Sequence, residues 1–137
     1  MKAVLRCLIV LFAALLLTGC LGQPVVNGVP EPRAVPNGDA AAGRRLIAQF
    51  GCGACHSIPG VPGADARAAP PLDHFYQRIY IAGKLPNTAD NLVKWITDPQ
   101  QVVPGNAMPD LGVTPDQARD MAAYLYHQPT LADWLGR

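Results

Sequence analysis

The chain has 137 residues, with 11 basic and 10 acidic side chains and a formal net charge of +1. A near-neutral charge argues against binding of nucleic acid, which needs a clustered basic surface. The length allows one small domain with terminal segments rather than two domains.

Residues 1–19 have the composition of a secretory signal. Lys2 and Arg6 precede an uninterrupted apolar run over residues 7–17, which is shorter than the roughly 20 apolar residues that a bilayer core requires. The run ends in the letters LTGC, which resemble the bacterial lipobox, the motif whose cysteine is diacylated and becomes the first residue of the mature protein. We therefore expect lipid on Cys20. The alternative is an ordinary signal peptide with a chance cysteine.

The rest of the chain divides into a tether, one domain and a short tail. Residues 20–38 hold four prolines and three glycines, which favour a semi-extended tether behind the lipid. The predicted domain covers residues 39–128, and a tail covers 129–137. Removal of the signal would take away two cations and change the formal charge from +1 to −1. It would also leave only Cys52 and Cys55 for chemistry other than lipidation.

Helical patterns dominate the predicted domain. The expected helices cover residues 40–50, 92–97 and 115–127. The second begins at Asn87, Thr88 or Asp90, which are all capping residues. It ends before Pro99 because a residue that precedes proline disfavours helix. A capping box at Thr114 and Gln117 opens the third. No segment alternates polar and apolar residues long enough to predict a strand. The fold class is therefore all-α, and a domain this small and rich in proline needs a staple or a large internal ligand.

The motif CGACH, at residues 52–56, places two thiols and an imidazole close together. A zinc site would need a second pair of ligands, and His74 and His127 stand alone and far apart. A thioredoxin-like pair needs a preceding strand, and a structural disulfide leaves His56 unexplained. Cys-x-x-Cys-His is instead the signature of covalent haem attachment. We expect one haem c, bound covalently through Cys52 and Cys55 with His56 on the iron.

A second axial ligand is expected on the other side of the iron. Met121 lies in the middle of the last amphipathic helix, where a core role explains it. Met108 lies in the irregular loop VVPGNAMPDLG, where no periodicity calls for a buried residue. We therefore predict Met108 as the ligand, with His74 or His127 as the alternatives. Thioether sulfur raises the reduction potential, and two occupied axial positions leave no site for a substrate, so we expect electron transfer and no catalysis.

These motifs, in this order, resemble the monohaem class I cytochromes c across residues 39–128. The resemblance implies three to four helices wrapped around one covalently bound haem. The letters APPLD resemble the family's Gly-Pro-x-Leu element, with Ala69 in the place of the usual glycine. The match implies that the Pro70 carbonyl accepts a hydrogen bond from Nδ1–H of His56 and that Leu72 packs on the haem ring. Such a bond orients the imidazole.

Residues 80–114 are similar in detail to the cytochrome c domain fused to subunit II of some bacterial cytochrome c oxidases. That pattern implies that Arg78 and Trp95 lie near the haem propionates or the distal pocket. The alternatives are a solvated loop arginine and a core tryptophan. The resemblance also implies a close crossing of the first and last helices at Gly43 and Tyr124, because glycine allows two backbones to approach.

The predicted function is that of a single-electron carrier, anchored by lipid and passing electrons between respiratory partners at the periplasmic membrane surface. We expect a monomer that docks transiently with an oxidase, a reductase or a dehydrogenase. The anchor would lie in the outer membrane or in the periplasmic face of the inner membrane. One alternative is a permanent haem subunit of a membrane oxidoreductase complex. Another is a haem-based redox or gas sensor.

Overall fold

The computed structural model describes residues 34–127. The predicted signal, Cys20, most of the tether and the tail 129–137 lie outside the described residues. In chain order the elements are α2 (Ala40–Gln49), η2 (Cys52–Ala54), η3 (Phe75–Gln77), β1 (Tyr80–Ile81), β2 (Leu85–Pro86), α3 (Ala89–Thr97), α4 (Pro99–Val102) and α5 (Pro115–Tyr126). Among these described elements, no helix is long and apolar enough to cross a membrane.

The first and last helices begin where their side chains cap them. The Asp39 carboxylate accepts hydrogen bonds from the backbone N–H groups of Ala41 and Ala42, and these bonds hold the pKa of Asp39 below its usual value. At α5, Thr114 and Gln117 form the predicted capping box, each side chain bonded to the other residue's backbone N–H. Both helices are therefore confirmed, and each ends one residue earlier than expected.

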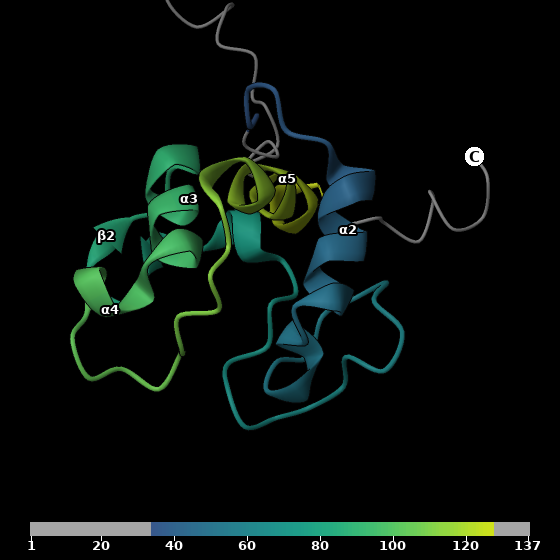
Figure 1. Ribbon diagram of the computed structural model, residues 1–137, viewed down its shortest axis with the longest axis horizontal. Helices are drawn as coiled ribbons and strands as arrows, with labels where there is room; N and C mark the ends of the chain where they lie inside the picture. Colours follow the sequence, from purple (N-terminus) through teal and green to yellow (C-terminus); the bar gives the residue numbers. More distant parts are fainter. Residues whose placement is uncertain (1–33, 128–137) are drawn as a thin grey trace, which may run out of the picture.

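α2 and α5 cross closely, and α5 lies between α2 and α3 (Figure 1). A Cβ atom built on Gly43 would lie only 1.9 Å from the backbone oxygen of Asp120, so that only glycine allows this approach. The backbone N–H of Asp39 donates to the Asp120 carboxylate at 2.9 Å and ties the start of α2 to α5. Met121 of α5 is 1% exposed, which confirms its core position.

The packed part of the chain begins before the predicted domain boundary at residue 39. Val35, within the predicted tether, is partly buried and packs against the hydrophobic core. A Cβ atom on Gly38 would lie 2.8 Å from the Cβ atom of Ala123 in α5. The last residues of the predicted tether are therefore part of the fold.

The middle of the chain differs from the sequence prediction. α3 begins at Ala89, behind the N-cap Thr88, and is three residues longer at its start than expected. Asp98 ends α3 and also caps a further helix, α4, by accepting from the backbone N–H of Gln101 at 2.9 Å. Pro99 takes the first position of α4, where the missing N–H of proline costs nothing. The sequence analysis ended the helix at this proline and did not predict the one that follows.

Two short strands correct the prediction that the domain has none. β1 and β2 pair antiparallel with Tyr80 opposite Pro86 and Ile81 opposite Leu85. Ala82 and Gly83, in the turn between them, both adopt left-handed backbone conformations, which are typical of tight hairpins. Strands of two residues are too short to show any alternation of polar and apolar positions, so the periodicity of the sequence could not reveal them.

Candidate haem-attachment site

The two cysteines lie on a single tight turn at the end of α2. Gly51 has a φ of 69° and takes the chain out of the helix in a left-handed conformation. The backbone N–H groups of Cys55 and His56 then donate to the carbonyl oxygen of Cys52, at 3.3 and 3.0 Å. Cys52 is half-buried and Cys55 is exposed, and neither forms a disulfide. Burial raises the pKa of the Cys52 thiol.

Gly53, between the two cysteines, is a site residue that the sequence analysis missed. A Cβ atom there would lie 2.7 Å from the Cβ atom of Ala64. Ala64 belongs to a loop that folds back on the turn, where Ser57 and Asp65 form an isolated antiparallel bridge. Glycine at this position therefore allows the loop with Ala64 to pack against the turn that holds the two cysteines.

The imidazole of His56 is held by a backbone carbonyl. Its Nδ1 lies 2.7 Å from the oxygen of Pro70, and because a carbonyl only accepts, Nδ1 carries the proton. The neutral ring therefore keeps its lone pair on Nε2, the atom that binds a metal when the other nitrogen is engaged in this way. Ala69 donates its N–H to the Cys55 carbonyl at 2.9 Å. Its φ is not positive, so this turn does not need the glycine that the resemblance implies at position 69.

Arg78 is half-buried and contacts the proline segment that follows the cysteine turn. Its guanidinium donates a hydrogen bond to the Pro71 carbonyl and stands 4.8 Å from the centre of the Phe75 ring. Burial lowers its pKa below the ordinary arginine value. The structure therefore brings Arg78 to Pro71, the residue that follows Pro70, whose carbonyl faces His56. Leu72 and Trp95 are both half-buried and pack against the core.

A buried asparagine holds the turn that carries Arg78. Asn87 is 4% exposed, and its amide nitrogen donates to the carbonyl oxygens of Phe75 and Arg78, both at 2.9 Å. Its amide oxygen accepts from the Tyr126 hydroxyl at 2.7 Å. The sequence analysis treated Asn87 only as a candidate helix cap, and Thr88 is the cap in the structure. Nothing in a single sequence distinguishes a buried bridging asparagine from a capping one.

The Met108 loop follows α4 and is organised by polar side chains. The amide nitrogen of Asn106 donates to the carbonyls of Pro99 and Val103, and its oxygen accepts from the Met108 N–H at 2.7 Å. Gln100 of α4 also bonds to this loop. The loop after α4 and the loops around η2 extend from the helices at the same end of the molecule, on opposite sides (Figure 1). The loop after α4 carries Met108, and the segment around η2 carries the two cysteines, so both lie at this end of the molecule (Figure 1).

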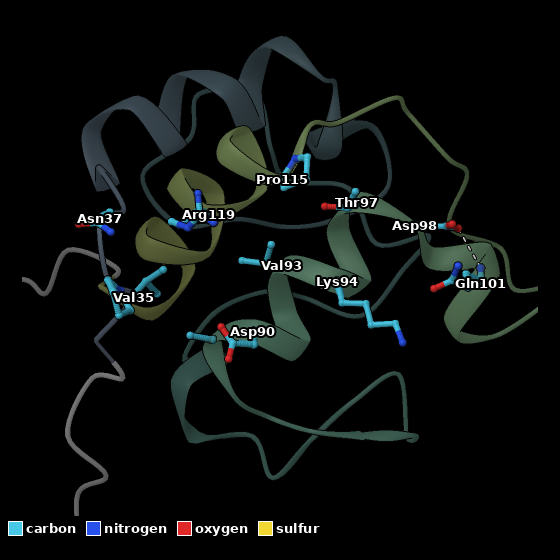
Figure 2. A pocket seen from close by; sticks show the side chains of 12 residues that line it. Val35, Asn37, Asp90, Val93, Lys94, Thr97, Asp98, Gln101, Pro115 and Arg119 are labelled. Carbon is cyan, nitrogen blue, oxygen red and sulfur yellow. Dashed lines mark hydrogen bonds between the residues drawn. The ribbon is translucent and has the colours of Figure 1, made fainter.

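A groove of about 800 Å³ lies elsewhere on the domain, between α3, the start of α5 and residues 35–37 (Figure 2). None of the predicted haem residues lines it. The groove is therefore not the predicted haem site. Cys52, Cys55 and His56 lie in the segment that follows α2, and Met108 lies in the loop that follows α4.

The donor set at the cysteine turn fits a covalently attached haem. Two thiols stand three residues apart without a disulfide, and the adjacent imidazole keeps Nε2 for a metal because Pro70 engages Nδ1. Together with a small helical domain and a methionine-bearing loop, this arrangement defines a c-type cytochrome. The chain belongs to the cytochrome c family, whose model matches residues 40–129. It therefore carries covalently bound haem c, with Cys52 and Cys55 in the attachment motif, and the family supports electron transfer.

The curated relatives are subunits of an oxidase. The chain is 37% identical over 93 residues to cytochrome c oxidase subunit 2 of Alkalihalophilus pseudofirmus, a match that covers 67% of this chain and 25% of that protein. It is 42% identical over 59 residues to the same subunit of Bacillus sp. strain PS3, covering 42% of this chain and 17% of that protein. The subunit from Bacillus subtilis is 35% identical over 71 residues, covering 50% of this chain and 20% of that protein.

The chain thus spans a quarter or less of the length of these relatives. Their similarity to this chain confirms the resemblance to the cytochrome c domain of oxidase subunit II that the sequence analysis stated. No solved structure gives a significant match.

Proposed function

We propose that this protein is a one-electron carrier with His56 and Met108 as axial ligands, anchored by lipid on Cys20 to a bacterial membrane and facing the periplasm. The observation that carries the electron-transfer part is the 2.7 Å contact between His56 Nδ1 and the Pro70 carbonyl. It supports a fixed imidazole ring whose Nε2 serves as a permanent ligand.

The residues of the chain have distinct roles in this proposal. Cys52 and Cys55 would hold the haem covalently, the Pro70 carbonyl orients His56 as one iron ligand, and Met108 would supply the other. The bound haem would supply a one-electron ferric–ferrous couple. Leu72 would pack against the haem, and Arg78 and Trp95 would lie towards its propionates or the Met108 side. Because the chain would supply both iron ligands, no position would be left for a substrate, so we propose that the protein acts as a carrier and not as an enzyme.

The partner in this proposal is a redox protein of a respiratory chain, such as an oxidase, a reductase or a dehydrogenase. The similarity to cytochrome c oxidase subunits supports an oxidase among these. A lipid anchor would confine the carrier to the surface on which such enzymes act and raise its effective concentration there. The same similarity favours a second candidate, a permanent haem subunit of a membrane oxidoreductase complex.

A redox titration of the purified holoprotein tests the carrier function. We expect a reversible transition that fits one electron per haem. We also expect carbon monoxide to bind the reduced protein only slowly at neutral pH, because Met108 must leave the iron first. Visible absorbance at a series of potentials measures the redox transition, and visible absorbance after addition of carbon monoxide measures its binding. Carbon monoxide binding by the unaltered reduced protein as fast as by Met108→Ala would contradict the carrier proposal and favour the sensor.

Cys20→Ser tests the anchor. The serine variant lacks the thiol that accepts lipid, so we expect the cytochrome to move from the membrane fraction to the soluble periplasmic fraction with its haem content unchanged. Fractionation followed by haem staining measures this distribution. A variant that stays with the membrane would contradict lipid anchoring at Cys20. Co-migration of the unaltered protein with a larger complex in mild detergent would favour the permanent subunit.

A further inference from the structure

Gln100 ties the Met108 loop to a helix by three hydrogen bonds. Its amide nitrogen donates to the carbonyl oxygens of Asn106 and Met108, at 3.1 and 2.8 Å, and its amide oxygen accepts from the N–H of Gly105 at 3.0 Å. A primary amide has both kinds of group on one rigid plane. One side chain therefore connects to three backbone positions around Met108.

The start of α4, the helix that carries Gln100, is itself held in place. Pro99 is buried and occupies the first position of α4, and the Asp98 carboxylate caps the helix by accepting from the N–H of Gln101. Asn106 belongs to the loop, where its oxygen accepts from the Met108 N–H, and its amide nitrogen also ties the loop to α4 through the Pro99 carbonyl at 2.9 Å. Gln100 reaches the loop from α4 through three further bonds, and one of these ends on Met108 itself. The Gln100 side chain therefore opposes motion of the loop away from α4.

We propose that Gln100 is the positioning residue that keeps Met108 on the haem iron. It never touches the iron. It acts by holding the carbonyl of Met108 and the backbone of Gly105 and Asn106 just before it. It thereby sets how rarely the sixth position opens to an external ligand. The inference rests on the proposed ligand role of Met108, and it goes beyond that role because it assigns the control of ligand access to a different side chain.

The expected size of the effect follows from the three bonds. Loss of one neutral hydrogen bond changes an equilibrium constant by roughly fivefold. Water replaces part of the loss, because the bonds are exposed or only partly buried. Gln100→Ala should therefore raise the population with Met108 detached by about 10- to 100-fold. The apparent rate at which carbon monoxide binds the reduced protein should rise by the same factor, because binding is proportional to the open fraction.

The chain offers a matched control in the next residue. Gln101 is also a glutamine of α4, but its side chain is exposed and lines the groove beside α3 (Figure 2). Only its backbone N–H bonds to Asp98, and Gln101→Ala keeps that bond. The two variants remove the same side chain from the same helix, and only one of them removes the connections to the Met108 loop.

The experiment compares carbon monoxide binding by the reduced holoproteins of the unaltered chain, Gln100→Ala, Gln101→Ala and Met108→Ala, together with their unfolding by denaturant. We expect fast binding in Met108→Ala, an increase of about 10- to 100-fold in Gln100→Ala, and no change in Gln101→Ala. If Gln100→Ala binds like Gln101→Ala, the proposal is overturned. It is also overturned if binding rises only in proportion to global unfolding, which indicates a merely structural role. If Met108→Ala binds carbon monoxide no faster than the unaltered protein, the ligand assignment itself is wrong.

Discussion

Replacement of both Cys52 and Cys55 by serine is expected to abolish covalent haem attachment completely. The two thiols lie on one turn without a disulfide, and a serine hydroxyl forms no thioether with a haem vinyl group. The domain should also lose most of its ordered helix, because a domain of this size needs its internal ligand to complete the core. Haem staining after denaturing electrophoresis measures attachment, and far-ultraviolet circular dichroism measures the helix.

The control for this double variant is Cys20→Ser, which removes a cysteine without touching the attachment motif. It should retain haem after denaturation to the same extent as the unaltered chain. Covalent haem in the double serine variant would show that the group is attached elsewhere, and it would contradict the assignment of both thiols.

Met108→Ala should change the iron centre without releasing the haem. Loss of the thioether removes the weak near-infrared band that the family resemblance implies for ferric iron with sulfur ligation. It should also lower the reduction potential by on the order of 100 mV, within the range of about 0.8 V over which axial ligands set haem potentials. Near-infrared absorbance and a redox titration measure the two effects.

Met121→Leu is the matched control, because this second methionine is buried in α5. A volume-conserving exchange in the core costs less than about 1.5 kcal/mol, and we expect the spectrum and the potential to stay unchanged. If Met108→Ala keeps its band and its potential, the sixth ligand is a different residue, and His74 and His127 return as the candidates.

Local signals predicted the helices best. The capping box at Thr114 and Gln117 lies within four residues, and its two bonds form in the structure as expected. The start of α3 was less certain, because three residues between 87 and 90 could each cap a helix. The tertiary structure settles this, since it buries Asn87 against Tyr126 and leaves Thr88 as the cap.

The supporting residues of the site were the least predictable. The asparagine and the glutamine that brace it, Asn87 and Gln100, each bond to backbone atoms several residues away. An amide side chain pairs with any donor or acceptor that the fold brings near it, so neither its type nor its spacing marks a partner in advance. Gly53 was missed for the same reason, because the atom that excludes a Cβ belongs to Ala64 on another loop.

The sequence by itself determined the cofactor. Cys52, Cys55 and His56 lie within five consecutive residues, and one tight turn is enough to place two thiols and an imidazole together. The tertiary structure decided what holds that turn and the Met108 loop in place. The contacts that do so join His56 to Pro70 and Gln100 to Met108. They depend on how separate segments pack, and packing is a property of the folded chain and not of any short stretch of it.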